Sequence, residues 1–483
     1  MKFFAQLRDM PDFSTIQAED IATAAGEAIN QTREGLRKIA EEPKPTYENT
    51  LQAMDRVYDK FEQVFSIAAL IAYVHPEEDV RNAALQQLPV LEKFLNELAL
   101  DEPLYLALQR YAATAQAKAL TGYKRKFLDE SLADFARNGL NLPKDKRDQL
   151  RAILDKQAEE GVRFDSNIAS YEDALFVDQE EARGLPDDYL KARQTEDGRY
   201  KIDLSYPSFR PFMKFAHSAR ARKALMQKFL NRAAEQNLPV LDKLLALRNQ
   251  HAAMLGYANF ADYNIADKMA KTAKAVRDFE EDLAEKVRPK ALNDYKELLE
   301  MKRELQNDPS VSQVHSYEAA YLTDHLLKRK YDVDQEKVKA YFPLNQVIDG
   351  LFTICGELFG VRFEEDKPPK TWHADVRAFR MYRDGEMAGH FYLDLFPRPN
   401  KFKHAASFPL RHGRQAPAGY QLPAATLVTN FPPPTQTCPS LLPHEEVVTL
   451  FHEFGHLMHD LLTRSPLSSF AGTKVSRDFV ETP

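Results

Sequence analysis

The placement of glycine constrains the fold of this chain more than any other feature of the sequence. Only 17 of the 483 residues are glycine, and none lies at positions 36–121 or 257–349. Both stretches are rich in Ala, Leu, Glu, Lys and Gln, which lose little conformational entropy in a helix. We therefore predict a mainly helical fold in which the first two-thirds of the chain is an array of helices.

Hydrophobic periodicity supports the same prediction. After Thr272, large apolar residues recur at steps of three and four with charged residues between them, as on one face of an amphipathic helix. These residues are Val276, Phe279, Leu283 and Val287. We expect Pro289 to kink or end this helix, because proline lacks the amide donor of a helical residue.

The composition changes in the last third of the chain. Apolar and aromatic residues partly alternate around Asp384-Gly385, a dipeptide typical of two-residue hairpin turns. This pattern predicts strands at 377–383 and 387–395. The segment 425–431 is a third extended candidate, because prolines follow it directly.

The charge balance and the apolar stretches exclude several classes of protein. The chain carries 65 Lys and Arg against 72 Asp and Glu, with no long basic tract that would bind nucleic acid. The longest apolar stretch, at 67–74, is far shorter than the roughly 18 residues of a membrane span. The opening segment has too short an apolar run for a signal peptide. We expect a cytoplasmic protein with no nucleic-acid or membrane partner, in which Cys355 and Cys438 are reduced thiols.

A His-Glu-x-x-His pentad at 452–456 carries the main chemical signal. Apolar residues around it step by threes and fours after Pro443, which predicts a helix. On a helix, His452 and His456 fall on one face, one turn apart, where two imidazoles can bind one zinc ion. Glu453 can then act as the general base on zinc-bound water.

Two packed core histidines are the plainer interpretation of the same pentad. By rough frequency arithmetic, a chance His-Glu-x-x-His should occur in only a few per cent of chains with 13 histidines. The chain supplies an internal control at His444, where the fourth following residue is Val448 and no ligand pair can form. We therefore interpret His444 as a helix-entry residue.

A zinc site of this kind needs a third protein ligand, which commonly comes from farther along the chain. Asp478 and Glu481 lie three residues apart and could share one side of a second helix. Either carboxylate could bind the metal, and the other could orient a ligand histidine through a hydrogen bond. A solvated helix face is the plainer alternative for both.

These segments together resemble the thimet oligopeptidase family, and within it most closely the bacterial oligopeptidase A branch. The letters HEFGHLMH at 452–459, followed by RDFVETP at 477–483, are similar to the zinc core of that family. The likeness extends to GHFYLDLFPR at 389–398, LVTNF at 427–431 and YFPL at 341–344.

Carried over position by position, the resemblance implies that His452, His456 and Glu481 bind one zinc ion per chain. It implies Glu453 as the general base. It therefore favours Glu481 as the third ligand, and Asp478 becomes a candidate to orient a ligand.

The resemblance also implies a multi-helix, two-lobed zincin metallopeptidase with a small β-sheet near the active site. Residues 1–340 would form a helical channel wall, and residues 341–483 the catalytic core. His459, nearly on the ligand face of its helix, is a second candidate to orient a ligand, although a structural role is as plausible.

The implied function is that of a zinc-dependent endo-oligopeptidase that hydrolyses short unstructured peptides, with a monomer favoured. No substrate-binding side chain is assigned, and the extended segments at 389–395 and 425–431 are candidates to hold substrate through main-chain hydrogen bonds. Family members continue beyond the position of Pro483, so we expect a core incomplete at its C-terminus, with weak zinc binding and slow or no turnover. The alternatives are a catalytically impaired peptide-binding or scaffold fragment and a dipeptidyl carboxypeptidase of the same family.

Overall fold

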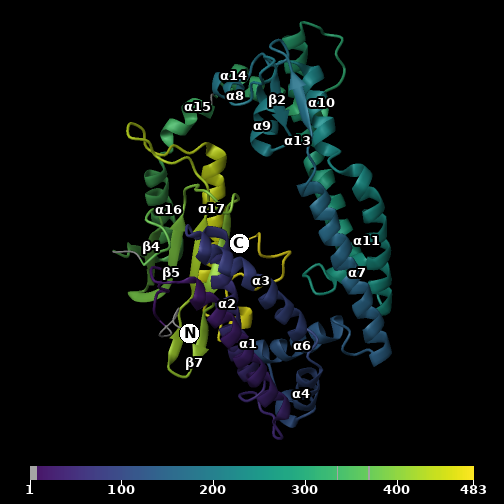
Figure 1. Cartoon of the computed structure of the whole chain (residues 1–483), viewed down its shortest axis with the longest axis vertical. Coiled ribbons are helices and arrows are strands. Elements are labelled where there is room, and N and C mark those ends of the chain that lie inside the picture. Colours follow the sequence, from purple (N-terminus) through teal and green to yellow (C-terminus); the bar gives the residue numbers. More distant parts are fainter. Residues whose placement is uncertain (1–7, 334, 368–369, 483) are drawn as a thin grey trace. The chain divides into compact units, whose positions relative to one another are not determined.

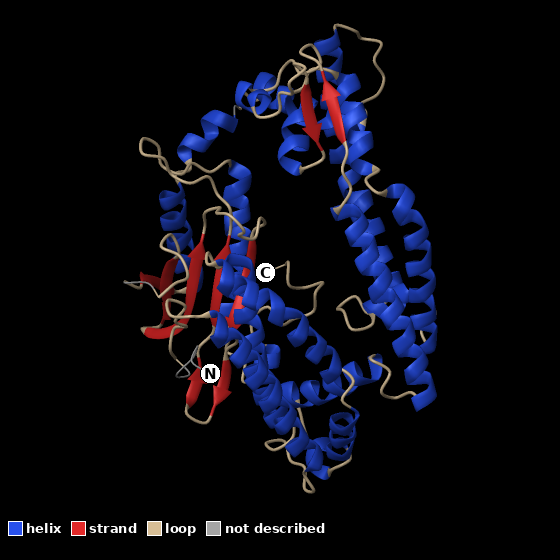
Figure 2. Cartoon of the chain, in the orientation of Figure 1, coloured by secondary structure: helices blue, strands red, loops and turns tan. Residues whose placement is uncertain are grey.

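The computed structural model describes residues 8–333, 335–367 and 370–482. The chain divides into two compact units, one comprising Met1–Pro143 and Gln335–Pro483 and the other Lys144–Asp334. Helices predominate in both, and strands are few (Figure 1 and Figure 2), which confirms the mainly helical prediction. Residues 1–7, part of the opening segment assessed for a signal peptide, lie outside the described residues. No described helix has the length and apolar character needed to cross a membrane.

The first unit opens with a group of helices that pack around one hydrophobic core. Its helices are α1 (Ala18–Glu41), α2 (Leu51–Val74), α3 (Glu78–Leu98), α4 (Glu102–Ala112), α5 (Ala115–Lys118) and α6 (Gly122–Arg137). Leu51, Leu91 and Leu108 are fully buried in this core. Local signals set the helix ends. The Asp101 side chain, for example, accepts a hydrogen bond from Leu104 N at 2.9 Å and so caps α4.

The second part of this unit contains a five-stranded mixed sheet with the order β3-β4-β5-β9-β6. Its strands are β3 (Val361–Glu365), β4 (Arg377–Arg383), β5 (Glu386–Asp394), β6 (Ala406–Arg411) and β9 (Ala424–Val428), and β7 (Arg414–Ala416) pairs separately with β8 (Gly419–Gln421). The β4–β5 hairpin turns at Asp384 and Gly385, which both have positive φ, as a two-residue turn of this kind requires.

The expected substrate strands are central strands of this sheet. β5 pairs antiparallel with β4 and parallel with β9, and β9 pairs antiparallel with β6 on its other side. Their main-chain donors and acceptors are therefore used within the sheet. The expectation that 389–395 and 425–431 hold a peptide as an added strand is wrong for the parts that form β5 and β9.

The two faces of the sheet pack against different helices. Along β5, Phe391 and Leu393 join a core with α16 (Leu344–Phe359) and α17 (His444–Leu461), whereas Tyr392 joins the core of the N-terminal helices. This alternation follows from the two-residue period of a strand. α17 is thereby fixed on the face opposite α1–α4. Three short helical segments complete the unit: α15 (Gln335–Val338), η1 (Lys339–Tyr341) and η2 (Ser468–Phe470).

The second unit is almost entirely helical. Its elements are α7 (Lys144–Ala169), β1 (Ala174–Val177), α8 (Asp187–Lys191), β2 (Tyr200–Asp203), α9 (Tyr206–Phe215), α10 (Ala219–Leu230), α11 (Ala234–Met254), α12 (Phe260–Ile265), α13 (Ala273–Gln306) and α14 (Ser316–Lys330). A buried ion pair between Lys302 and Glu318, at 2.6 Å, joins α13 to α14. α7 contacts α11, where the Gln157 amide donates to Leu247 O at 3.1 Å.

Helix α13 differs from its prediction in one respect. It starts after Thr272, whose hydroxyl accepts from Ala275 N, but it continues through Pro289 to Gln306. The predicted apolar stripe is present on this helix, yet Phe279 is 63% exposed among the residues that the structure describes. The periodicity therefore predicted the helix correctly. The apolar stripe, however, is not covered by the other described elements.

Candidate metal centre

Helix α17 presents His452 and His456 from one face. Pro443 precedes the helix, and Glu445 in its first turn interacts favourably with the helix dipole. Leu450, Leu457 and Leu461 are fully buried on the sheet side. The ligand face is consequently left open, and the His452 side chain is 49% exposed while that of His456 is 15% exposed.

The two imidazoles face each other across one helical turn. The Nε2 atoms of His452 and His456 lie 3.2 Å apart, and the ring planes are nearly perpendicular, at 85°. Two neutral imidazoles that both present an unprotonated Nε2 repel each other at this distance unless a proton or a cation lies between them. At this distance one neutral imidazole can donate a hydrogen bond to the other, or both Nε2 atoms can bind one cation.

Glu481 completes a triangle with this pair. Its Oε2 lies 3.1 Å from His452 Nε2 and 3.3 Å from His456 Nε2. His452, His456 and Glu481 form a possible metal-binding group of three among the described residues. The carboxylate reaches the histidines from a segment that follows α17, so two separate stretches of chain meet at one point.

The dimensions of this triangle fit a zinc ion. Tetrahedral zinc binds nitrogen and oxygen ligands at about 2.0–2.2 Å, which places two ligand atoms of one ion about 3.3–3.5 Å apart. The three observed separations of 3.1–3.3 Å lie close to this value. Two imidazoles and one carboxylate also leave one tetrahedral position for a water or a substrate oxygen.

The backbone that carries Glu481 differs from the expected second helix. Residues 477–481 form successive hydrogen-bonded turns, in which Phe479 N and Val480 N both donate to Ser476 O, at 2.9 and 3.2 Å. Too few consecutive bonds of the helical type form here to make a helix. The spacing of Asp478 and Glu481 therefore does not place them on one helix face.

The other predicted residues lie nearby on the same two segments. Glu453 is half-buried on α17 directly after His452, and Asp478 is exposed on the turn that leads to Glu481. His459 lines an apolar cavity of about 500 Å³ together with Gly455 of the same helix. Burial, and secondarily the neighbouring His456, lowers the pKa of His459.

Sequence reasoning missed Asp460 in the last turn of α17. Its side chain is buried, with 4% exposure, and burial raises its pKa to about 6. The available signal was an acidic residue on the apolar side of an amphipathic helix, four positions after His456. A buried carboxylic acid needs hydrogen-bond partners, and those of Asp460 come from the irregular segment that follows α17.

Comparison with known proteins identifies the family of this chain. Residues 212–483, more than half of the chain, match the family model described as peptidase family M3. The chain belongs to peptidase family M3. Residues 26–147 also match the N-terminal domain of neurolysin and thimet oligopeptidase.

Several M3 relatives match almost the whole chain. It is 34% identical to the thimet-like oligopeptidase of Dictyostelium discoideum, over 96% of this chain and 72% of that protein. It is 31% identical to oligopeptidase A of Escherichia coli, over 98% of this chain and 72% of that protein. It is 29% identical to saccharolysin of Saccharomyces cerevisiae, over 96% of this chain and 68% of that protein. The resemblance inferred from the motifs is confirmed, and membership of family M3 implies a peptidase that uses zinc.

Proposed function

We propose that this chain is a zinc-dependent endo-oligopeptidase that hydrolyses peptide bonds in short, unstructured peptides. The observation that carries the proposal is the triangle formed by His452 Nε2, His456 Nε2 and Glu481 Oε2, with sides of 3.1–3.3 Å. Membership of family M3 supports peptides as the substrate class.

Each ligand residue has a definite chemical task in this proposal. To bind zinc through Nε2, His452 and His456 would each be the neutral tautomer with its proton on Nδ1. Glu481 supplies one negative charge that offsets part of the charge of the cation. A zinc ion held by these three residues would polarise the scissile carbonyl and increase the acidity of water at the open position.

Glu453 is the proposed general base and then general acid. It follows His452 directly, about 100° farther around the helix, and its side chain is half-buried beside the ligand face. Its carboxylate takes a proton from the attacking water. The same carboxyl group then gives a proton to the leaving amine, so the enzyme returns to its starting protonation state.

The test compares cleavage of an internally quenched peptide by the wild type, Glu453→Gln and Glu445→Gln, each loaded with zinc. Glu445 lies in the first turn of the same helix and serves as the matched control. We expect Glu453→Gln to lose at least about a hundredfold in kcat, in line with the usual contribution of a general base. Zinc content should be unchanged, and equal rates for all three proteins would contradict the proposal.

The same assay separates an endopeptidase from a dipeptidyl carboxypeptidase. A peptide with an amidated C-terminus lacks the free carboxylate that a carboxypeptidase must recognise. We expect the free and amidated forms to be cleaved at internal bonds with similar kcat/KM. Release of C-terminal dipeptides from the free form alone would favour the carboxypeptidase.

A further inference from the structure

The segment that connects α17 to Glu481 has little regular structure of its own. Between Leu461 and Glu481 the described chain contains only the single-turn η2 and several turns. Such a segment moves freely unless side chains elsewhere hold it. The position of Glu481 beside the two histidines therefore depends on what anchors this segment.

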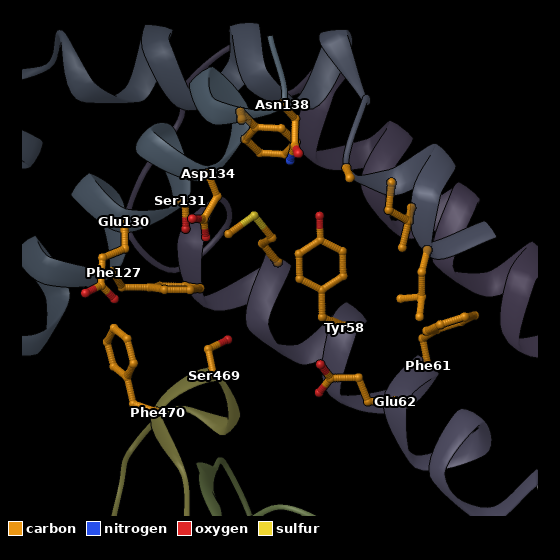
Figure 3. Close-up of a pocket in the computed structure, with 15 residues that line it drawn as sticks. Tyr58, Phe61, Glu62, Phe127, Glu130, Ser131, Asp134, Asn138, Ser469 and Phe470 are labelled. Carbon is orange, nitrogen blue, oxygen red and sulfur yellow. The ribbon is translucent and has the colours of Figure 1, made fainter. Parts of the chain in front are cut away.

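Asp55 of α2 anchors the first part of the segment. Its carboxylate, with 1% exposure, accepts hydrogen bonds from the amides and hydroxyls of both Ser468 and Ser469, at 2.8–3.1 Å. Figure 3 shows Ser469 and Phe470 beside a cavity of about 350 Å³, with Tyr58 and Glu62 of α2 on its wall. η2 is thus fixed against the N-terminal helices.

Asp460 anchors the next part, and it does so from the helix that carries the histidines. Its Oδ1 accepts from Thr473 N and from Thr473 Oγ1, both at 2.9 Å. Asp460 follows His456 by one helical turn. Because α17 is rigid over one turn, holding Thr473 to Asp460 also holds it at a constant distance from the histidine ligand.

Gly472 makes this close approach possible. Its φ is +56°, in the left-handed region, and a Cβ at this position would lie 2.7 Å from Asp460 Cα and clash with Asp460 Oδ1. Only glycine can both adopt this left-handed conformation and allow Asp460 to approach so closely at low energy. Lys474 then pairs with Glu62 of α2, so the chain is held on both sides of Thr473.

We propose that Asp460 is a positioning residue of the metal centre, which acts through Thr473 to hold Glu481 against His452 and His456. The inference rests on the proposed function, since it concerns the same three ligands. Without the Thr473 contact, the segment is still held to α2 by Asp55 and Glu62, but the hydrogen bonds that tie it to the ligand helix itself are lost.

The test measures the zinc Kd of the full chain by competition with a chelating dye. The variants are Asp460→Ala, which removes the acceptor, and Thr473→Val, which removes only the hydroxyl donor. We expect Asp460→Ala to raise Kd about threefold to tenfold, the usual effect of losing a hydrogen bond, and Thr473→Val to raise it by less. Thr449→Val is the matched control, because the Thr449 hydroxyl bonds to Glu445 O within the same helix, and its Kd should stay within about twofold of wild type.

A double-mutant cycle shows whether Asp460 acts through Glu481. In a Glu481→Ala background, Asp460→Ala and Thr473→Val should produce no further rise in Kd, because the ligand that they position is gone. A purely structural role would give the same rise in both backgrounds and would overturn the inference. If Asp460→Ala does not fold, the Thr473→Val cycle decides the question in its place.

Two further outcomes separate this inference from the proposed function. An unchanged Kd for folded Asp460→Ala and Thr473→Val, in a protein whose zinc binding is lost in His452→Ala, overturns the positioning role alone. Zinc binding that is absent in the wild type, or unaffected by His452→Ala, overturns the proposed metal centre and the positioning role together. Amide hydrogen exchange of residues 472–481 in the metal-free protein gives a second readout, which should speed up in Thr473→Val and not in Thr449→Val.

Discussion

Asp59 of α2 and Arg414 of β7 form a buried ion pair, with Arg414 Nε donating to Asp59 Oδ2 at 2.7 Å across 355 positions of sequence. Both side chains are nearly inaccessible, at 1% and 7% exposure. The amides of Gln421 and Gln63 also donate to the Asp59 carboxylate. Burial nevertheless raises the pKa of Asp59, against the lowering effects of Arg414 and the two amides. The pair therefore ties the N-terminal helices to the sheet region but carries a large desolvation cost.

Removing one partner of this pair should lower the free energy of unfolding more than removing both. We expect Arg414→Met to lower the free energy of unfolding by about 3–5 kcal/mol, because it leaves a buried carboxylate without its cation. The double variant Asp59→Leu/Arg414→Met should recover part of this loss, since it removes the buried charge but also the acceptor of the Gln63 amide. Urea unfolding measures both changes. Arg125→Met, which breaks the exposed pair with Asp129, is the control and should leave the unfolding midpoint near that of wild type. A double variant no more stable than Arg414→Met would contradict this account.

The features that could be predicted from sequence are those set by neighbouring residues. The helical bias of glycine-free stretches, the hairpin at Asp384-Gly385 and the one-turn spacing of His452 and His456 each depend on local geometry alone. The predicted end of the helix at Pro289 is wrong, because α13 continues there, and the alternative of a kink stays a prediction. One missing amide donor evidently costs less than ending a helix of 34 residues.

The features that could not be predicted depend on partners far away in sequence. Asp55 looks like an ordinary helix acid until its contacts with Ser468 and Ser469 are seen. Likewise, the segments that form β5 and β9 looked suitable for binding a peptide, and only the strand order shows that both of their edges are already paired. Spacing alone also left the choice between Asp478 and Glu481 open, because it cannot say how a turn directs its side chains.

Two buried histidines should make a destabilising contribution in mild acid. Burial lowers the pKa of His412 to about 3 and that of His390 to about 4. Both therefore stay neutral in the folded chain, whereas in the unfolded chain they take up protons below about pH 6.5. For these two groups the unfolded state then binds more protons, so their contribution to the free energy of unfolding falls as pH falls from about 6.5 toward 4, by up to about 1.4 kcal/mol per pH unit for each histidine.

Urea unfolding at pH values from 7.5 to 5, in the presence of a chelator, measures this dependence. The variant His412→Leu removes one titrating group from the core and should flatten the slope. His404→Leu, at an exposed histidine, is the control and should keep the wild-type slope. A slope for His412→Leu as steep as that of wild type would show that His412 does not stay neutral in the folded protein.

The two acidic residues of the turn at 477–481 should differ in their effect on metal binding. Glu481 has its Oε2 within 3.3 Å of both histidine Nε2 atoms, and Asp478 is exposed on the same turn. We expect Glu481→Ala to raise the zinc Kd by more than about a hundredfold. Asp478→Ala, as the matched variant, should raise it by about tenfold or less, which is the low end for residues that only orient a ligand. Equilibrium dialysis with zinc measures both, and the reverse order would make Asp478 the third ligand.

Gly472→Ala should weaken both stability and zinc binding. The substitution places a side chain at a φ of +56° and pushes it into Asp460, so either the turn changes conformation or the Asp460–Thr473 contact opens. We expect the free energy of unfolding to fall by at least about 1 kcal/mol and the zinc Kd to rise in the same direction as in Thr473→Val. Gly26→Ala provides the control, because Gly26 lies exposed within α1 with open space around it, and alanine there should stabilise the helix by about 1 kcal/mol without changing Kd. Thermal unfolding and dye competition on the same samples measure the two effects. A Gly472→Ala protein that loses stability but keeps the wild-type Kd would mean that the loop reaches Glu481 correctly without the Asp460 contact.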